Sequence, residues 1–453
     1  MRPISIGMIC AAVSGELICG DAEHTVTSVT TDSRTKNGGL FIALKGERFD
    51  ANDFVSSYLE NGDSALVSRK IPPVSGKNIV YVPDTGKALL ALAGAYRRLF
   101  DIPVIGITGS VGKTSTKEMI YSVLSQKFHA MKTDGNFNNE IGVPLTLFRL
   151  EDGLQCAVVE MGMSNFGEMS RLTSAVRPDI AVITNIGTAH IGNLGSRENI
   201  MKAKLEILEG MNGDGLVILN GDDRLLYSLK GTLPVRTLYY GINNRDCDIC
   251  AENVTTSAGG SEFCARGVKY RISVPGEHNV YNALAAILAG EALGIETALL
   301  QKGVSEFENC GMRQNIIKYG GITLIEDCYN ASLDSVAASI KVLKSISEGR
   351  SIAVLGDILE QGDFAEKIHT EVGKAAAREN IDVLITVGEN ARFIAAAAKD
   401  AVKTVVSFDG NCSAWEYLDK IMAKGDTVLF KASRGMKLEE VCEKAKKKAE
   451  GIK

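Results

Sequence analysis

The chain has 453 residues, of which 45% are hydrophobic and 23% charged, as in an ordinary globular protein. Its net charge of −5 excludes a protein that binds nucleic acid over its whole surface. No apolar run is long enough to cross a membrane and the first residues lack the apolar stretch of an export signal, so we expect a cytoplasmic protein with reduced cysteines.

The length predicts about three domains, which we place at residues 1–84, 85–312 and 313–453. In the first, short apolar runs follow turn signals. Asn37-Gly38-Gly39 precedes Leu40–Leu44, and Asn61-Gly62-Asp63 precedes Ala65–Val67. This alternation predicts a small α/β domain.

The second domain repeats a strand, a turn and a helix. A helical pattern over Lys87–Phe100 leads into a strand at Pro103–Ile107, and further strands are predicted at Cys156–Val159 and Ile180–Thr184. This order predicts a mostly parallel sheet with helical crossovers. Residues 235–275 predict a small antiparallel insertion, and Asn279–Leu293 predicts an alanine-rich helix.

The third domain alternates apolar strands with helical segments. The predicted strands are Ile322–Glu326, Ser351–Leu355, Asp382–Val387, Thr404–Phe408 and Thr427–Lys431. This pattern predicts a doubly wound, Rossmann-like α/β domain. The lysine-rich residues 443–453 also contain Glu and Ala, which favours a solvated final helix over a nucleic-acid-binding tail.

A glycine-rich run connects the strand at Pro103–Ile107 to a helix predicted over Thr116–Gln126. Position 107 is Ile where the strict phosphate-loop pattern has Gly, but Gly-Lys-Thr-Ser stands between strand and helix. Backbone N–H groups and the helix N-terminus can hold phosphate oxygens there, with Lys113 at the outer phosphates and Thr114 on Mg²⁺. The candidate loop residues are Gly109, Ser110, Val111, Gly112, Lys113, Thr114 and Ser115.

Two further polar residues follow predicted strands. Glu160 ends the strand Cys156–Val159, and His190 follows the strand that ends at Thr184. Ligands of open parallel sheets bind at the carboxyl ends of strands, and Mg²⁺ prefers oxygen ligands. Glu160 is therefore a candidate Mg²⁺ ligand, whereas a single His is by itself a weak signal.

A series of motifs, in order along nearly the whole chain, resembles the Mur ligase family. The motifs are Asp32-Ser33-Arg34, Gly38 to Gly46, Thr108 to Ser115, Gly135 to Pro144, Glu160-Met161-Gly162, Thr184 to His190, Lys202 to Ile207, His278 to Ala286, Asp327 to Ala331, Leu355 to Glu360 and Ser433 to Met436. Within the family, the strongest similarity is to members that join D-alanyl-D-alanine to UDP-N-acetylmuramoyl-tripeptide.

The resemblance implies roles for residues of this chain. Lys113, His190 and Lys204 would be catalytic, and Thr114, Glu160, His190 and a carbamylated Lys204 would bind two Mg²⁺ ions. Besides the loop, the residues implied to contact ATP are Asn279, Asn282, Arg313 and Asp327. Those implied to hold the uridine end of the substrate are Ser33, Arg34, Gly46, Arg48 and Phe49.

The reaction implied is ATP-dependent C–N bond formation. A carboxylate is a poor acceptor for an amine, so ATP would first convert it to an acyl phosphate, which the amine then attacks. The partners would be small molecules only, and a monomer is expected. The third residue of the tripeptide, diaminopimelate or lysine, does not follow from the sequence.

Two segments depart from the family pattern. Tyr329-Asn330-Ala331-Ser332-Leu333 stands where similar ligases read Tyr-Asn-Ala-Asn-Pro, which predicts a looser turn. Asp50-Ala51-Asn52-Asp53 stands where relatives often have Asp-Gly-His-Asp. The details of ligand contact at these two places therefore do not follow from the family pattern.

Several alternatives remain at this point. The protein could be a sister ligase that adds a different amine, or a phosphate-loop ATPase or switch without ligase chemistry. A dehydrogenase is excluded because no Gly-x-Gly-x-x-Gly opens a βα unit.

Individual residues also have alternative interpretations. Lys204 could be a surface residue paired with Glu206 or Glu209, and Asp357 could face the dipeptide or cap the next helix. Cys247, Cys250 and Cys264 could suggest zinc, but buried thiols are the better interpretation.

Overall fold

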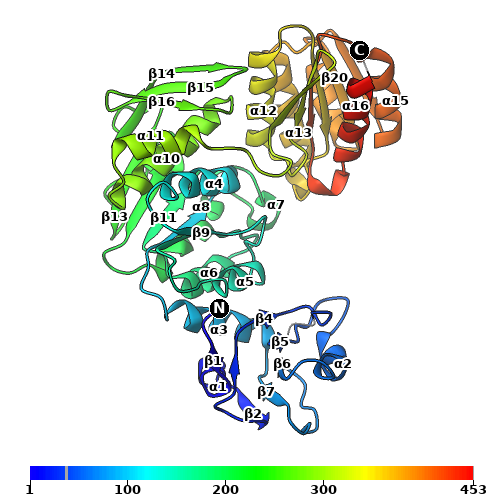
Figure 1. Ribbon diagram of the computed structural model, residues 1–453. Coiled ribbons are helices and arrows are strands. Elements are labelled where there is room, and N and C mark those ends of the chain that lie inside the picture. The colour runs from blue at the N-terminus through cyan, green and yellow to red at the C-terminus, as the bar shows by residue number, and fades with distance from the viewer. Residues whose placement is uncertain (36–38, 452–453) are drawn as a thin grey trace. The chain divides into compact units, whose positions relative to one another are not determined.

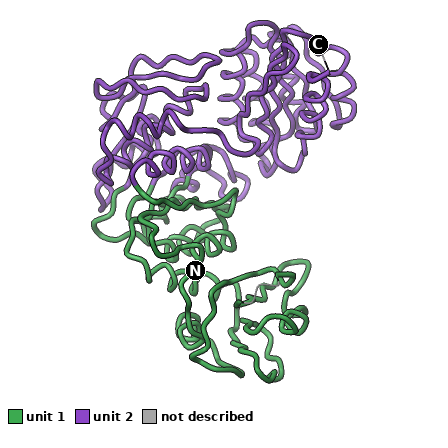
Figure 2. The backbone as a smooth tube through the Cα atoms, viewed as in Figure 1, with its two compact units in different colours: residues 1–108, 128–181, 204–216 green, residues 109–127, 182–203, 217–453 purple. Residues whose placement is uncertain are grey.

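The computed structural model describes residues 1–35 and 39–451 and divides into two compact units (Figure 2). Unit 1 comprises residues 1–108, 128–181 and 204–216, and unit 2 comprises 109–127, 182–203 and 217–453. The predicted turn residues Asn37 and Gly38 lie outside the described residues. Both units are α/β, with mostly parallel sheets (Figure 1).

The N-terminal part of unit 1 carries a five-stranded sheet in the order β2-β7-β6-β5-β4. Of its described strands, only β2 is antiparallel to its neighbour. The elements are β1 (Ile4–Ser5), α1 (Ile6–Val13), β2 (Glu16–Cys19), β3 (Thr25–Val26), β4 (Val29–Thr30), β5 (Leu40–Ile42), η1 (Ala51–Phe54), α2 (Val55–Leu59), β6 (Ser64–Val67) and β7 (Asn78–Tyr81). The core between the sheet and α2 includes Phe41 stacked on Tyr58, their ring centroids 4.8 Å apart. The predicted small α/β domain is present.

The rest of unit 1 contains the three parallel strands β8 (Val104–Thr108), β10 (Cys156–Glu160) and β9 (Ala130–Lys132), in that order. Every residue of β8 and β10 is buried, as expected of strands covered on both faces. The helical segments are α3 (Thr85–Arg97), α5 (Gly142–Leu147), α6 (Glu168–Val176) and η2 (Glu206–Gly210). Helix α3 begins at its N-cap Asp84, whose carboxylate accepts from two backbone N–H groups.

Three elements, β11 (Ile180–Ile183), α8 (Arg197–Leu205) and β12 (Leu216–Asn220), begin in one unit and end in the other. The first part of unit 2 contains α4 (Lys113–Leu124), α7 (Ile191–Leu194), α9 (Arg224–Tyr227), α10 (Glu277–Ala292) and α11 (Thr297–Ser305). Its strands are β12 (Leu216–Asn220), β13 (Arg236–Gly241), β14 (Ile249–Ser257), β15 (Gly260–Ala265) and β16 (Val268–Ile272). Strands β14, β15 and β16 are antiparallel, which confirms the predicted insertion, although β13 and β14 pair in parallel.

The C-terminal part of unit 2 is a six-stranded sheet in the order β17-β18-β22-β19-β20-β21, parallel except for β17. Its strands are β17 (Asn315–Tyr319), β18 (Ile322–Glu326), β19 (Ser351–Gly356), β20 (Val383–Val387), β21 (Thr404–Phe408) and β22 (Thr427–Lys431). Its helices are α12 (Leu333–Ile346), η3 (Gly362–Phe364), α13 (Ala365–Arg378), α14 (Ala391–Ala398), α15 (Asn411–Ile421), η4 (Arg434–Met436) and α16 (Glu439–Gly451).

Alternate residues of these strands face a core under α15 and α16. Ile322, Leu324, Val428 and Phe430 lie in this core, with Leu418 of α15 and other buried residues of the two helices. The remaining helices, α12 to α14, pack against one another in sequence (Figure 1). The predicted doubly wound domain is therefore present, and its final helix α16 is solvated on one face while Val441, Cys442, Ala445 and Ala449 pack in the core.

Candidate active site

The predicted phosphate-binding loop lies in unit 2, directly before α4. Gly109 and Gly112 both have positive φ angles, 150° and 81°. A Cβ atom at Gly109 would lie 1.9 Å from Thr184 Oγ1, so a larger residue does not fit there unless its neighbours move. Gly112 is the N-cap of α4, where backbone N–H groups without intrahelical partners and the helix dipole favour an anion. Both glycines are therefore required by the shape of the loop.

The residues that follow β11 hold this loop in place. Ser110 N–H donates to the Asn185 carbonyl at 3.1 Å, and Val111 N–H donates to Asn185 Oδ1 at 3.0 Å. Thr184 Oγ1 and Asn185 Nδ2 both donate to the Val111 carbonyl, at 2.6 Å and 3.1 Å. Two loop N–H groups thus bind protein rather than point at a phosphate, which differs from the expectation for the whole loop. The sequence placed Thr184 and Asn185 at a strand end but assigned them no role.

The side chains of the loop bring a cation and a hydroxyl together. Lys113 Nζ donates to the Gly109 carbonyl at 2.8 Å and lies 3.5 Å from the Ser110 carbonyl, so the ammonium group lies over the loop. Ser110 Oγ is buried and has no hydrogen-bond partner among the described residues. Thr114, in the first turn of α4, is also buried. A buried hydroxyl, an ammonium group and a helix N-terminus form an arrangement that suits phosphate oxygens.

Asn279 and Asn282 lie near the start of α10, and Asn282 contacts α4. Thr116 Oγ1 donates to Asn282 Oδ1 at 2.9 Å, Asn282 Nδ2 donates to Asn279 Oδ1 at 3.2 Å, and Asn279 Nδ2 donates to the Pro275 carbonyl at 3.0 Å. A Cβ atom at Gly112 would lie 3.4 Å from Asn282 Oδ1, so Asn282 borders the loop itself. The structure therefore brings Asn282 to the phosphate-binding loop and links Asn279 to it.

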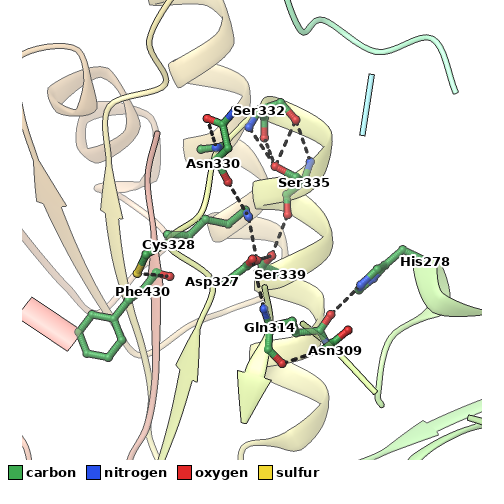
Figure 3. A network of polar contacts seen from close by, with 12 residues as sticks. His278, Asn309, Gln314, Asp327, Cys328, Asn330, Ser332, Ser335, Ser339 and Phe430 are labelled. Atoms are coloured by element: carbon green, nitrogen blue, oxygen red, sulfur yellow. Dashed lines mark hydrogen bonds and ion pairs between the residues drawn. The ribbon is translucent and has the colours of Figure 1, made fainter. Parts of the chain in front are cut away.

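Asp327 follows β18 and forms a buried ion pair. Asp327 Oδ2 accepts from Lys431 Nζ at 2.7 Å and from Ser339 Oγ at 2.6 Å (Figure 3). The guanidinium carbon of Arg313 lies 3.7 Å from the centroid of the Tyr329 ring, a cation–π contact that orients it. Lys431 was missed by the sequence reasoning, where it was only the last residue of a predicted strand. The single available signal was a lysine at the carboxyl end of a parallel strand.

The segment that departs from the family pattern after Tyr329 is not a loose turn. Ser332 caps α12, and it forms a capping box with Ser335, in which each hydroxyl bonds the backbone N–H of the other residue. Leu333 takes the first helical position, which Pro also favours. The expected loosening was therefore wrong, because the serine pair replaces the lost constraint.

His190 lies in the loop before α7, with a positive φ of 63°. Its Nδ1 lies 3.5 Å from Glu360 Oε2, and that carboxylate is 72% exposed. The carboxylate of Asp357 binds a different group. Its Oδ1 accepts from the backbone N–H of Ala391 at 2.6 Å, at the start of α14. Asp357 therefore caps a helix, as one of its two interpretations predicted, but the helix is α14 rather than the next helix, α13.

A carboxylate not singled out by the sequence reasoning packs against the segment between β11 and His190. A Cβ atom at Gly187 would lie 2.3 Å from Asp334 Oδ2 and 3.2 Å from Ser110 Cβ. Burial raises the pKa of Asp334, while nearby Arg197 acts in the opposite direction. Gly187 therefore makes room for this carboxylate beside the phosphate-binding loop.

In unit 1, Glu160 and Lys204 are both almost fully buried, at 1% exposure. Glu160 Oε1 accepts from Asn138 Nδ2 at 2.8 Å, and its N–H donates to Thr133 Oγ1 at 3.0 Å. Lys204 does not form a surface pair with Glu206, whose carboxylate accepts from backbone N–H groups at the start of α6. Glu209 accepts from Ser170 Oγ. The surface interpretation of Lys204 was therefore wrong.

The segments implied to hold the uridine end lie in the N-terminal part of unit 1. Arg34 forms a two-bond fork with Asp32, at 2.9 and 2.7 Å. These hydrogen bonds lower the pKa of Asp32 to about 2. Ser33 lies between these two residues, so the fork defines its turn. The pair is exposed, with the Arg34 side chain at 88%, and is available to a ligand.

The second of these segments is a tight turn. Gly46 N–H donates to the Phe49 carbonyl at 2.9 Å, and Lys45 and Asp50 form a β-bridge, with Arg48 inside the turn. The exposed Phe49 ring packs edge-on against Phe54, at 5.5 Å between centroids. The departing residue Asn52 is buried and exchanges hydrogen bonds with Ser68, so it stabilises the fold here.

The cysteines of the insertion behave as packed thiols. Cys250 Sγ lies 3.3 Å from the Asn244 carbonyl, and burial raises the pKa of the Cys247 thiol to about 12. Across the described ranges, no group of three or more His, Cys, Asp or Glu side chains is placed to hold a metal ion, as a zinc site made of protein side chains would need. Nor does any helix of the described residues have the length and apolarity needed to span a membrane.

Comparison with known proteins places this fold and site in a family. Residues 107–290 match the Mur ligase middle domain, and residues 312–434 match the Mur ligase, glutamate ligase domain. A curated relative from Bacillus subtilis (strain 168), named UDP-N-acetylmuramoyl-tripeptide–D-alanyl-D-alanine ligase, is 42% identical over 443 residues and covers 96% of each chain. The chain belongs to the Mur ligase family.

Solved structures agree over the whole length. The crystal structure of MurF from Acinetobacter baumannii has a TM-score of 0.91 at 31% identity and covers 98% of this chain and 99% of that one. MurF ligase from Thermotoga maritima, in complex with ADP, has a TM-score of 0.84 at 28% identity, with 94% and 98% covered. The protein is thus a ligase with the three-domain α/β fold of these structures.

Proposed function

We propose that this protein is a cytoplasmic, ATP-dependent ligase that adds D-alanyl-D-alanine to UDP-N-acetylmuramoyl-tripeptide. The observation that carries the proposal is the 42% identity, over 96% of both chains, to a relative named for that reaction. The phosphate-binding loop and the Asp327–Lys431 pair supply a site of the required kind. The proposed domains are residues 1–84 for the UDP-linked substrate, 85–312 for ATP, and 313–453 for the dipeptide and for closure over ATP.

The residues present fit a nucleoside triphosphate with Mg²⁺. The loop places the Lys113 ammonium group at the N-terminus of α4, together with the buried Ser110 hydroxyl, which has no hydrogen-bond partner in the described part of the chain. Gly109, Val111, Gly112, Thr114 and Ser115 would complete the phosphate site, and Asn279, Asn282, Arg313 and Asp327 would contact the rest of the nucleotide. Bound Mg²⁺ would supply positive charge to offset the phosphates.

Thr114, Glu160, His190 and Lys204 would hold two Mg²⁺ ions, and we propose that Lys204 is carbamylated. An unmodified ammonium group would repel a cation, whereas a carbamate offers oxygen ligands. The support for this proposal is burial, since Lys204 is only 1% exposed. A buried lysine needs a compensating interaction, because an isolated buried charge is costly.

The chemistry requires positive charge where two anions meet. The substrate carboxylate must approach the γ-phosphate, and two unit charges 4 Å apart repel by about 4 kcal/mol at an effective dielectric near 20. Lys113 would offset this repulsion during formation of the acyl phosphate. The dipeptide amine then attacks the acyl carbon, the new C–N bond forms, and phosphate leaves. Because water also hydrolyses an acyl phosphate, the site must exclude it.

The N-terminal segments would recognise the uridine end of the substrate. The exposed Phe49 ring could stack on a base, and the Arg34 fork, adjacent to Ser33, could pair with phosphate oxygens. Gly46 and Arg48 would complete this surface from the same turn as Phe49. We also propose that the protein acts as a monomer, which sedimentation equilibrium tests.

The proposed function is tested by phosphate release from ATP and Mg²⁺ with UDP-N-acetylmuramoyl-tripeptide, with and without D-alanyl-D-alanine. Release that needs both substrates, and a product heavier by the dipeptide less water, would establish it. The diaminopimelate and lysine forms of the tripeptide should be compared in parallel. Release with a single amino acid in place of the dipeptide would indicate a sister ligase, and release without either substrate would indicate an ATPase.

A further inference from the structure

Gln314 has an unusual backbone and is almost completely buried. Its φ is 51°, in the left-handed region that residues other than glycine rarely adopt, and its exposure is 6%. It stands between Arg313 and β17. A residue keeps this conformation only where its surroundings hold it there, so the contacts of Gln314 indicate what it does.

The side chain of Gln314 binds the segment that begins α10. Its Nε2 donates to the Pro275 carbonyl at 2.6 Å. Its Oε1 lies 2.7 Å from His278 Nε2 (Figure 3). Because the Pro275 carbonyl can only accept, the amide orientation is determined, and His278 Nε2 must carry the hydrogen it donates. The same carbonyl accepts from Asn279 Nδ2 at 3.0 Å. Gln314 and Asn279 therefore share one acceptor.

The backbone of Gln314 binds the other side of the site. Its N–H donates to Asp327 Oδ1 at 3.3 Å, while Asp327 Oδ2 accepts from Lys431 and Ser339. Its carbonyl accepts from Asn309 Nδ2 at 3.1 Å. All four polar groups of Gln314 are thus occupied, and one residue joins Pro275 and His278, at the start of α10, to the carboxylate after β18.

We infer that Gln314 is a positioning residue for ATP binding, because it holds Asn279, Arg313 and Asp327 in fixed positions relative to one another. The inference rests on the proposed function, since those three residues are its proposed nucleotide contacts. Arg313 precedes Gln314 directly, so the fixed backbone at Gln314 also aims the Arg313 side chain toward Tyr329. Gln314 itself touches no reacting atom.

Two substitutions separate the side chain from the backbone. Gln314→Met keeps the approximate volume but removes both side-chain hydrogen bonds, and Gln314→Gly permits the positive φ without any side chain. Gln301→Met is the matched control, because Gln301 makes one hydrogen bond, to the Lys269 carbonyl, in a surface position. For each protein the KM values of all three substrates, kcat, and the Kd of ATP with Mg²⁺ are measured.

Gln314→Met and Gln314→Gly should each raise the KM and Kd for ATP about tenfold, since each loses two buried hydrogen bonds. The KM values for the UDP-linked substrate and the dipeptide should stay within about twofold, as should every constant of Gln301→Met. A merely structural role would lower kcat through loss of folded enzyme and leave the KM for ATP unchanged.

Either variant with wild-type affinity for ATP, or with equal rises in all three KM values, would overturn the inference. If Gln314→Met does not fold, Gln314→Gly decides the matter alone, and if neither folds, the role is structural and the inference fails. The Kd of ATP is read without product formation. A wild-type protein that binds ATP but makes no dipeptide adduct would therefore refute the proposed function and leave the test of Gln314 intact.

Discussion

Gly109→Ala should disable the phosphate-binding loop. The new Cβ would lie 1.9 Å from Thr184 Oγ1, at a φ of 150° that L side chains rarely adopt. Such backbone strain costs about 1–3 kcal/mol. Displacing Thr184 also breaks its 2.6 Å hydrogen bond to the Val111 carbonyl, which is worth about 1 kcal/mol. The sum of about 2–4 kcal/mol corresponds to ATP binding weakened roughly 30- to 1000-fold.

The assay is isothermal titration of ATP with Mg²⁺, alongside a thermal unfolding curve for each variant. Gly231→Ala is the matched control, because Gly231 also has a positive φ, 76°, but no atom lies within 4 Å of its added Cβ. The double variant Gly109→Ala/Thr184→Ala removes the clashing hydroxyl, so its loss should be smaller than the sum of the two single losses. Wild-type affinity in Gly109→Ala, or strict additivity in the double variant, would refute this reasoning.

Three other substitutions test separate parts of the site. Lys204→Ala should abolish product formation, with no recovery in high bicarbonate but partial recovery with a short carboxylic acid; wild-type activity would contradict a carbamate at Lys204. Arg34→Ala should raise the KM for the UDP-linked substrate several-fold and leave that for ATP unchanged. The pKa of Asp32 is lowered to about 2, so its ion pair with Arg34 is fully formed at any pH above the ordinary pKa of an aspartate and is lost only as the pH falls toward 2. The rise in KM caused by Arg34→Ala should therefore be constant from pH 5 to 9, and a variation across that range would contradict this prediction. Thr116→Val should lower the free energy of unfolding by about 1–3 kcal/mol, since it leaves the buried Asn282 Oδ1 without its donor. Denaturant titration measures this free energy, and Thr116→Ser is the control that keeps the hydroxyl. Equal unfolding midpoints for the Val and Ser variants would contradict the prediction.

The elements with strong apolar periodicity could be predicted from the sequence. β10, β18 and β22 lie within a residue of their expected bounds because each is a short buried run that ends at a polar residue. β17 was missed, although Gly320 and Gly321, both with positive φ, form the turn that connects it to β18. Two glycines between two apolar runs are typical of a β-hairpin turn, so β17 could have been predicted from the sequence. The domain boundaries and the roles of the site residues stay predictions.

The partners of site residues could not be predicted, because they lie far away in sequence. Lys431 pairs with Asp327 across 104 positions, and Asn185 bonds Val111 across 74. The burial of Lys204 was also hidden, since α8 has no clear apolar face in its sequence, RENIMKAKL. Local patterns identify which residues form a strand or a loop, whereas these contacts depend on how strands are ordered in the sheet.

The dependence of the phosphate-binding loop on Thr184 and Asn185 has a consequence for protein engineering. Residues 109–115 alone do not encode the shape of the loop, because the neighbouring strand end bonds the backbone of Ser110 and Val111. A graft of these residues onto another strand and helix would therefore need a Thr-Asn pair at the adjacent strand end. Residues 109–115 and the Thr184-Asn185 pair would therefore have to be grafted together.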